Sequence, residues 1–239
     1  MNLIKVDIIL PCYNPEEKWA DNVIEHFRSI QEAAQGWIPN LIVVNDGSAR
    51  GIHTEDIEKI KASIKDAKWI SYEVNRGKGY ALRKGVEQSR AEYIVLTDID
   101  FPYTTDSLVT MVDSIIRGEG DVLAGERKTT YYEHTPLLRK YISKLLKTIL
   151  KGFLRLPVTD TQCGLKVMNR AVAPLFLRTT IDRYLFDVEF LWMAAKEFRV
   201  CPYVVTLRSG IVFSKMNGSV LMTEAWNFIR LFFRTIVGK

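Results

Sequence analysis

The sequence predicts an α/β fold with a mainly parallel central sheet and flanking helices. Apolar strand patterns alternate with amphipathic helix patterns through the first half of the chain, and polar clusters follow several of the strands. The 239 residues are 47% hydrophobic and 26% charged, which is ordinary for a globular protein with a sizeable core. Alternation of strands and helices favours a parallel sheet covered on both faces. Such sheets bind ligands beyond the carboxyl ends of their strands.

The first two strand–helix units occupy the N-terminal quarter. Residues 5–14 contain an apolar run that predicts a strand ending at Pro11. Residues 16–34 predict an amphipathic helix, since their apolar side chains recur every three or four positions. Residues 40–48 predict an apolar strand that ends in turn residues. Residues 54–67 predict a helix, with Thr54 as its N-terminal cap.

The same alternation continues to about the middle of the chain. Residues 68–74 predict a strand and residues 78–90 a helix. Residues 91–100 predict a further strand that carries two acids at its end. Residues 106–118 predict a helix, and residues 120–127 a short strand. The polar ends of these strands are therefore expected to converge on one edge of the sheet.

The second half differs in character. Residues 137–156 are basic and apolar with no acid, residues 159–166 predict a polar loop, and residues 182–198 predict an apolar helix that carries the acids Asp187 and Glu189. The tail, 221–239, is again basic and apolar. We expect one domain over 1–220, with the basic amphipathic helix within it, followed by a C-terminal amphipathic helix.

Charge and cysteine content limit the class of protein only loosely. The net charge of +5 and the isoelectric point of about 9.0 suit anionic ligands, nucleic acid or an acidic membrane surface, and select none of them. No apolar run reaches the length of a membrane span, so a soluble or peripheral protein is expected. The cysteines are odd in number and form no CxxC pair, which favours a reducing, cytoplasmic setting. They are Cys12, Cys163 and Cys201.

Asp98 and Asp100 flank a single isoleucine at the end of an apolar run. In an extended segment, side chains two positions apart point to the same face, so the two carboxylates would repel each other without a cation between them. Mg²⁺ and Mn²⁺ are commonly bound by one or two carboxylates together with substrate phosphates. The alternative is that both acids cap the following turn.

Two further clusters have the character of a nucleotide site. Asp46, in the stretch "VVNDGS" (43–48) that ends an apolar strand, can accept hydrogen bonds from a base or ribose; an ordinary Asn-Asp-Gly turn is the alternative. Arg76 and Lys78 alternate with glycines at a helix start, which suits phosphate binding. A solvated basic turn is the alternative for that segment. The sequence of this segment, residues 75–85, matches neither a P-loop nor a dinucleotide-binding fingerprint.

The order of these clusters resembles a known family. "LPCYN", "VVNDGS", "NRGKGYALRKG" and "LTDID" occur as in glycosyltransferase family 2, the inverting nucleotide-sugar transferases of the GT-A fold. The resemblance covers residues 4–220. "DTQCGLKVMNR" and "FDVEFLWMAAK" are similar to the branch that glycosylates polyprenyl phosphates, which includes the dolichyl-phosphate glucose and mannose synthases.

The resemblance implies a role for each matching stretch. Asp98 and Asp100 would hold Mg²⁺ or Mn²⁺ against the donor diphosphate, and Arg127 would lie near the phosphates. Asp187 and Glu189 would lie near the reacting centre. The nucleotide-sugar pocket would contain Pro11, Tyr13, Asn14, Asp46, Gly77, Lys78 and Asp98. The loop beside the sugar and the acceptor would contribute Asp160, Gln162, Cys163 and Lys215.

The acceptor decides which further groups the reaction needs. A sugar hydroxyl would need a general base, for which Asp187 and Glu189 are the candidates. A polyprenyl phosphate is already anionic and would need cationic guides instead, such as Arg127, Arg139 or Lys215. The sequence departs from the pattern of the branch at Val220, where lysine is expected, and at Asn45, where many relatives have aspartate.

The implied function is inverting transfer of a hexose from UDP-glucose or GDP-mannose to a polyprenyl phosphate, on the cytoplasmic face of a membrane. The alternative is transfer to a hydroxyl of a polysaccharide or lipid-linked oligosaccharide. The basic segments are expected to bind an anionic membrane surface, or else to pack on the domain or on another copy in a homo-oligomer. A nucleic-acid-binding module would explain the charge but not the carboxylate pair, so nucleic acid is not expected as a partner.

Overall fold

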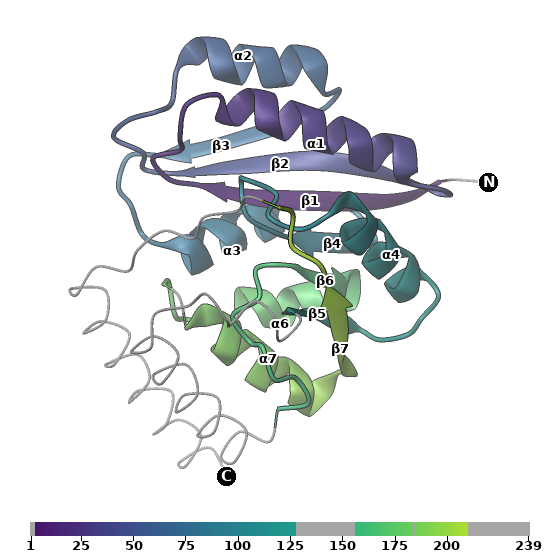
Figure 1. Cartoon of the computed structure of the whole chain (residues 1–239). Helices are drawn as coiled ribbons and strands as arrows, with labels where there is room; N and C mark the ends of the chain where they lie inside the picture. Colours follow the sequence, from purple (N-terminus) through teal and green to yellow (C-terminus); the bar gives the residue numbers. More distant parts are fainter. Residues whose placement is uncertain (1–2, 128–155, 184, 210–239) are drawn as a thin grey trace.

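The computed structural model describes residues 3–127, 156–183 and 185–209. Within them, seven strands form one sheet in the order β3-β2-β1-β4-β6-β5-β7 (Figure 1). Neighbouring strands are parallel except for β6, which is antiparallel to both β4 and β5. The strands are β1 (Ile4–Cys12), β2 (Trp37–Asp46), β3 (Lys68–Tyr72), β4 (Tyr93–Leu96), β5 (Val122–Arg127), β6 (Lys166–Asn169) and β7 (Val200–Val205). The predicted α/β class with a mainly parallel sheet is confirmed.

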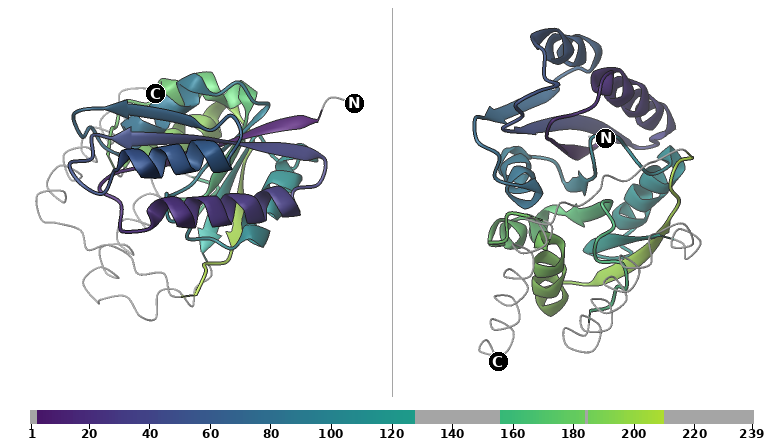
Figure 2. Two further views of the ribbon diagram at one scale, coloured as in Figure 1. Left: turned by 90° about the horizontal axis from the view of Figure 1, so that it is seen from above. Right: turned by 60° about the vertical axis from the view of Figure 1, so that its left-hand side comes forward.

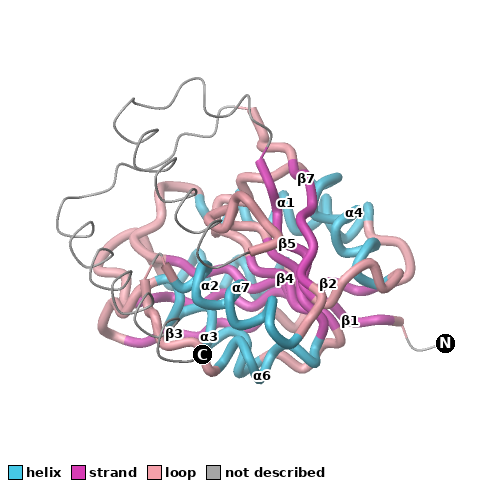
Figure 3. Tube along the Cα trace, turned by 90° about the horizontal axis from the view of Figure 1, so that it is seen from below, coloured by secondary structure: helices cyan, strands magenta, loops and turns pink. Residues whose placement is uncertain are grey.

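Helices cover both faces of the sheet (Figure 2). One face carries α1, α2 and α4, and the other carries α3, α6 and α7. Figure 3 shows α1 and α4 toward the top of the view and α3 and α6 at the bottom, with the strands between them. The helices are α1 (Trp19–Ala33), α2 (Thr54–Ser63), α3 (Lys78–Gln88), α4 (Thr105–Ile116), α6 (Ala173–Leu177) and α7 (Phe186–Glu197), with a 3₁₀ turn η2 (Arg170–Val172) before α6.

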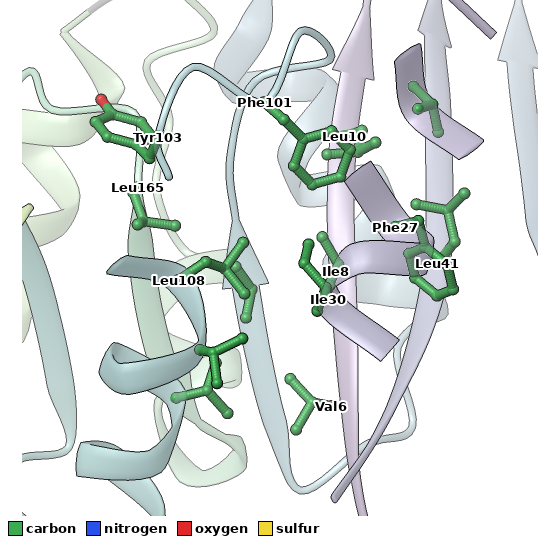
Figure 4. Close-up of a cluster of buried hydrophobic side chains, with 14 of the residues drawn as sticks. Val6, Ile8, Leu10, Phe27, Ile30, Leu41, Phe101, Tyr103, Leu108 and Leu165 are labelled. Atoms are coloured by element: carbon green, nitrogen blue, oxygen red, sulfur yellow. The ribbon is translucent and has the colours of Figure 1, made fainter. Parts of the chain in front are cut away.

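The central strands are buried on both sides, as expected for parallel strands between two helix layers. Along β1, Ile8 and Leu10 face the core under α1, where Phe27 is fully buried (Figure 4). Ile9 faces the opposite core. Burying each such aliphatic side chain stabilises the fold by about 1.5–3 kcal/mol. This rigid pair of cores fixes the strand ends that carry the polar clusters.

The structure corrects several expected boundaries. The strand predicted to reach Asp100 ends at Leu96, and Ile99 and Asp100 lie in a turn. Thr54 is the first residue of α2 and not its cap; His53 takes the cap position and makes no side-chain capping bond. The loop predicted over 159–166 runs into β6, whose four residues are too few, and too interrupted by lysine, to show a strand pattern.

The parallel registers bring the carboxyl ends of β1, β2, β4 and β5 to the same edge of the sheet. The strand-end clusters of the sequence therefore do converge. In the described part of the chain, no helix is long and apolar enough to cross a membrane. Arg139, Lys215, Val220, nearly all of the basic segment 137–156 and the whole tail 221–239 lie outside the described residues.

Candidate active site

Asn14 joins the loops that follow β1 and β2. Its backbone is left-handed, with φ 45°, a conformation that asparagine tolerates better than most residues. Its N–H donates to Ser48 Oγ at 2.9 Å, and its Oδ1 accepts from the backbone N–H of Ala49 at 2.9 Å. Two other predicted pocket residues lie beside it: Pro11 is half-buried and Tyr13 is 52% exposed. The Tyr13 ring is thus available to a ligand.

Asp46 is buried and shapes the loop before α3. Its carboxylate accepts hydrogen bonds at 2.8 Å each from Tyr72 Oη, Asn75 Nδ2 and the backbone N–H groups of Arg76 and Gly77. Four donors on one carboxylate are a strong, charge-assisted set. The Asp46 carboxylate therefore holds the glycine-containing loop of residues 75–77, and it fixes the backbone where α3 begins.

The glycines of that loop allow another segment to pass very close. Gly77 has φ 112°, and a Cβ there would lie 2.5 Å from the carbonyl oxygen of Asp182. A Cβ on Gly79 would lie 2.6 Å from the carbonyl oxygen of Ile181, and Gly79 N–H donates to Asp182 O at 2.7 Å. Lys78 stands between the two glycines, at the first residue of α3. Backbone packing thus fixes the place of Lys78.

Glu189 and Arg83 hold the segment that crosses the glycines. Glu189 is 1% exposed, and its carboxylate accepts from Thr180 N–H and Ile181 N–H at 2.8 Å each. Arg83, also buried, donates to Ile181 O at 3.0 Å and pairs with Asp182. Glu189, a candidate general base from the sequence, is therefore hydrogen-bonded to this segment and holds it in position.

Lys78 is the cation that balances the two aspartates after β4. Its ammonium is ion-paired with Asp98 Oδ1, and the side chains of Lys78 and Asp98 are 24% and 35% exposed. Burial alone would lower the pKa of Lys78, but the charges of Asp98, Asp187 and Asp100 outweigh it and raise that pKa. The turn brings the two aspartates close enough to interact, although it is not an extended strand.

Asp100 is exposed at the surface, yet its surroundings disfavour its charge. Partial desolvation and then the neighbouring Asp98 raise the pKa of Asp100, against the opposing effects of Lys78 and Arg208. A divalent cation between Asp98 and Asp100 would reverse this effect, because it would stabilise both carboxylates.

Gly164 brings the loop of residues 160–164 against Asp98. A Cβ at Gly164 would lie 2.2 Å from Asp98 Oδ2, so any other residue there would displace this carboxylate. The loop is held by Tyr103, whose Oη accepts from Gly164 N–H at 2.8 Å and lies 3.2 Å from Cys163 Sγ. Burial raises the pKa of the Cys163 thiol, as expected of a packing residue and not of a nucleophile.

Arg127 and Asp160 form a bidentate ion pair at the end of β5. Nε and Nη2 of Arg127 donate to the two carboxylate oxygens at 2.7 and 2.8 Å. The two side chains are 11% and 5% exposed. Burial alone would lower the pKa of Arg127, but Asp160 raises it. The third predicted residue of this loop, Gln162, is exposed.

Lys166 is a buried cation that the sequence analysis did not identify. Its Nζ lies 2.5 Å from Asp187 Oδ1 and donates to Cys163 O at 2.6 Å, with 2% of the side chain exposed. Burial raises the pKa of Asp187, while Lys166 and then Lys78 oppose that shift. The available signal was a lysine inside the apolar run "GLKVM", because a buried lysine requires an acidic partner.

The carboxylates at this edge suit a divalent cation whose coordination shell is completed by oxygen atoms of the substrate. No group of three or more histidine, cysteine, aspartate or glutamate side chains suited to a metal occurs among residues 3–127, 156–183 and 185–209. Asp98 and Asp100 nevertheless supply carboxylate oxygens, and an ammonium already sits on one of them. Mg²⁺ and Mn²⁺ typically take one or two carboxylates plus phosphate oxygens. These two residues fit that pattern.

Comparison with known proteins agrees with this geometry. The family model described as glycosyl transferase family 2 matches residues 7–175, most of the chain. The chain belongs to this family. It is therefore a glycosyltransferase, and its sheet with helices on both faces is the GT-A fold.

Curated members of the family align along nearly the whole chain. The dolichyl-phosphate beta-glucosyltransferase of Dictyostelium discoideum is 24% identical, with 98% of this chain and 76% of the relative covered. The human protein of the same name is 27% identical, with 95% and 72% covered. Glucosyl-3-phosphoglycerate synthase of Mycobacterium tuberculosis has a similar fold, with a TM-score of 0.66, 17% identity and 98% and 80% of the two chains covered.

Proposed function

We propose that this glycosyltransferase moves a hexose, with inversion, from a nucleotide-sugar to a polyprenyl phosphate. The pair Asp98–Asp100, with Lys78 at the same sheet edge, carries the proposal for the donor site. The curated relatives are named for dolichyl phosphate and glucose, which supports a polyprenyl phosphate acceptor and favours UDP-glucose over GDP-mannose. A related fold has been solved with Mn²⁺ and UDP-glucose, which supports a divalent metal.

The chemistry is displacement at the anomeric carbon. A phosphate oxygen of the acceptor forms the new bond, and the bond to the nucleoside diphosphate breaks with its electron pair leaving on oxygen. When bound, Mg²⁺ or Mn²⁺ supplies positive charge that stabilises this leaving group. Asp98 and Asp100 would hold the metal, and Lys78 would contact the diphosphate. Tyr13 would contact the nucleotide from its exposed position.

The state of the two candidate bases favours a phosphate acceptor. The Asp187 carboxylate is paired with Lys166, and that of Glu189 receives backbone and side-chain donors from Thr180 and Ile181. A sugar hydroxyl would need one of them as general base. A polyprenyl phosphate is anionic at neutral pH and needs none. This contrast supports a phosphate acceptor over a glycan hydroxyl.

We further propose that the enzyme acts peripherally at the cytoplasmic face of a membrane. Support comes from the basic, apolar composition of 137–156 and 221–239, which suits an anionic bilayer surface. Flotation of the purified protein with anionic vesicles tests the membrane contact, and failure to float would contradict that contact.

The experiment that tests the transfer reaction is nucleoside diphosphate release by purified protein. UDP-glucose or GDP-mannose is supplied with Mn²⁺, with and without a short polyprenyl phosphate in detergent. We expect release from UDP-glucose that requires both metal and lipid. Binding of a donor without lipid-dependent turnover would move the acceptor to a glycan hydroxyl. No binding of either donor would overturn the proposal.

Because of the ion pair between Lys78 and Asp98, removing Lys78 is expected to change the affinities for metal and for nucleotide in opposite directions. Because Lys78 neutralises Asp98, Lys78→Met should bind Mn²⁺ alone about tenfold more tightly. The same variant should bind UDP less tightly than wild type, because a cation for the diphosphate is lost. Both affinities are measured by calorimetry. Lys84→Met is the control, because Lys84 lies on the same helix and its loss changes the net charge equally. Unchanged Mn²⁺ affinity in Lys78→Met would contradict the prediction.

A further inference from the structure

Arg208 contacts the backbone of the turn that carries Asp98 and Asp100, although it lies more than 100 positions away in the sequence. Its Nη2 donates to Asp100 O at 2.5 Å and its Nε to Phe101 O at 2.6 Å. Its own N–H donates to Pro102 O at 2.9 Å. Three consecutive carbonyl groups of the turn thus receive their hydrogen bonds from one residue.

The turn has an unfavourable backbone that needs such support. Phe101 has φ 45°, which is rare and strained for a residue with a bulky side chain. Its ring is buried beside Leu10 of β1 (Figure 4), and its N–H donates to Asp98 O at 3.1 Å. The ring therefore anchors one side of the turn. The carbonyl groups of Asp100 and Phe101 on its other side are bonded by Arg208.

Arg208 is itself held in place by the segment that follows β7. Thr104 N–H donates to Thr206 O at 3.0 Å, and Tyr103 forms a bridge with Leu207. The guanidinium also contacts His26 Nε2 on α1. Its fork is thus oriented before any ligand binds, in the planar geometry that arginine, unlike lysine, provides.

We propose that Arg208 is a positioning residue for the metal-binding turn. By fixing the carbonyl groups of Asp100 and Phe101, it sets where the Asp100 carboxylate stands relative to that of Asp98. This inference rests on the proposed role of those two carboxylates as metal ligands. Groups that orient metal ligands commonly contribute about 10–100-fold to metal affinity.

The test is the Mn²⁺ affinity of Arg208→Met, Arg208→Lys and a matched control, Arg199→Met. Arg199 also donates to a loop carbonyl, that of Gly118, but lies at the opposite end of β7 from Arg208. We expect Arg208→Met to bind Mn²⁺ at least about tenfold more weakly and Arg208→Lys to be weakened too, because a lysine cannot reproduce the fork. The control should stay within about twofold of wild type. UDP binding measured with a chelator should also stay unchanged in the Arg208 variants, whereas a general loss of structure would weaken it.

The inference would be overturned if the Arg208→Met variant folds and binds Mn²⁺ with an affinity within about twofold of wild type. If Arg208→Met does not fold by circular dichroism, Arg208→Lys decides in the same way. Asp100→Asn separates this result from failure of the proposed function. If Asp100→Asn binds Mn²⁺ as tightly as wild type, the metal role of the turn is wrong. If Asp100→Asn loses Mn²⁺ but the Arg208 variants do not, only the positioning role is wrong.

Discussion

Replacing Asp100 by alanine is expected to lower kcat for nucleoside diphosphate release by on the order of 10²–10³-fold. The variant loses one of two carboxylates proposed to hold the metal at the leaving diphosphate. Its fold should be retained, because Asp100 is exposed and already repelled by Asp98. Steady-state kinetics with saturating Mn²⁺ and donor measure the effect.

Asp106→Ala is the matched control for Asp100→Ala. Asp106 is also an exposed aspartate, six positions further on, in the first turn of α4. Its removal costs only a helix-dipole interaction of about 0.3–1 kcal/mol and should leave kcat unchanged. Full activity of Asp100→Ala would refute the metal role of this residue.

Replacing Gly164 by alanine is expected to reduce activity by about 10–100-fold, because the new methyl group would displace the Asp98 carboxylate. The new Cβ would stand 2.2 Å from Asp98 Oδ2, well inside contact distance. The carboxylate is the more movable partner, because the Gly164 backbone is tied to Tyr103. Asp98 would therefore shift away from both Lys78 and the metal position. Mn²⁺ affinity and kcat should fall together.

Gly118→Ala provides the comparison for Gly164→Ala. A Cβ at Gly118 meets nothing within 4 Å, although its φ of 79° makes any side chain strained. That variant should lose about 1 kcal/mol of unfolding free energy, measured with urea, without loss of activity. If Gly164→Ala keeps wild-type activity, the loop and the Asp98 carboxylate are not as tightly coupled as the structure indicates.

The site could be predicted from sequence where its residues lie next to strands. Each of Asn14, Asp46 and the pair Asp98–Asp100 follows an apolar run, and parallel strands bring such ends together. The partners of these residues could not be predicted, because they come from distant parts of the chain. Lys166, Gly164 and Arg208 acquire their roles only when β6 inserts between β4 and β5, and when the segment after β7 pairs with 102–104.

The sequence by itself determined the fold class, the order of the early elements and the edge of the sheet that carries the polar residues. It did so because hydrophobic periodicity and turn chemistry are local properties. Only the tertiary structure decided the partners of the charged side chains in the site. Lys78 forms an ion pair with Asp98, Lys166 with Asp187, and Arg127 with Asp160. These pairings depend on burial and on distances across the sheet, which no single segment encodes.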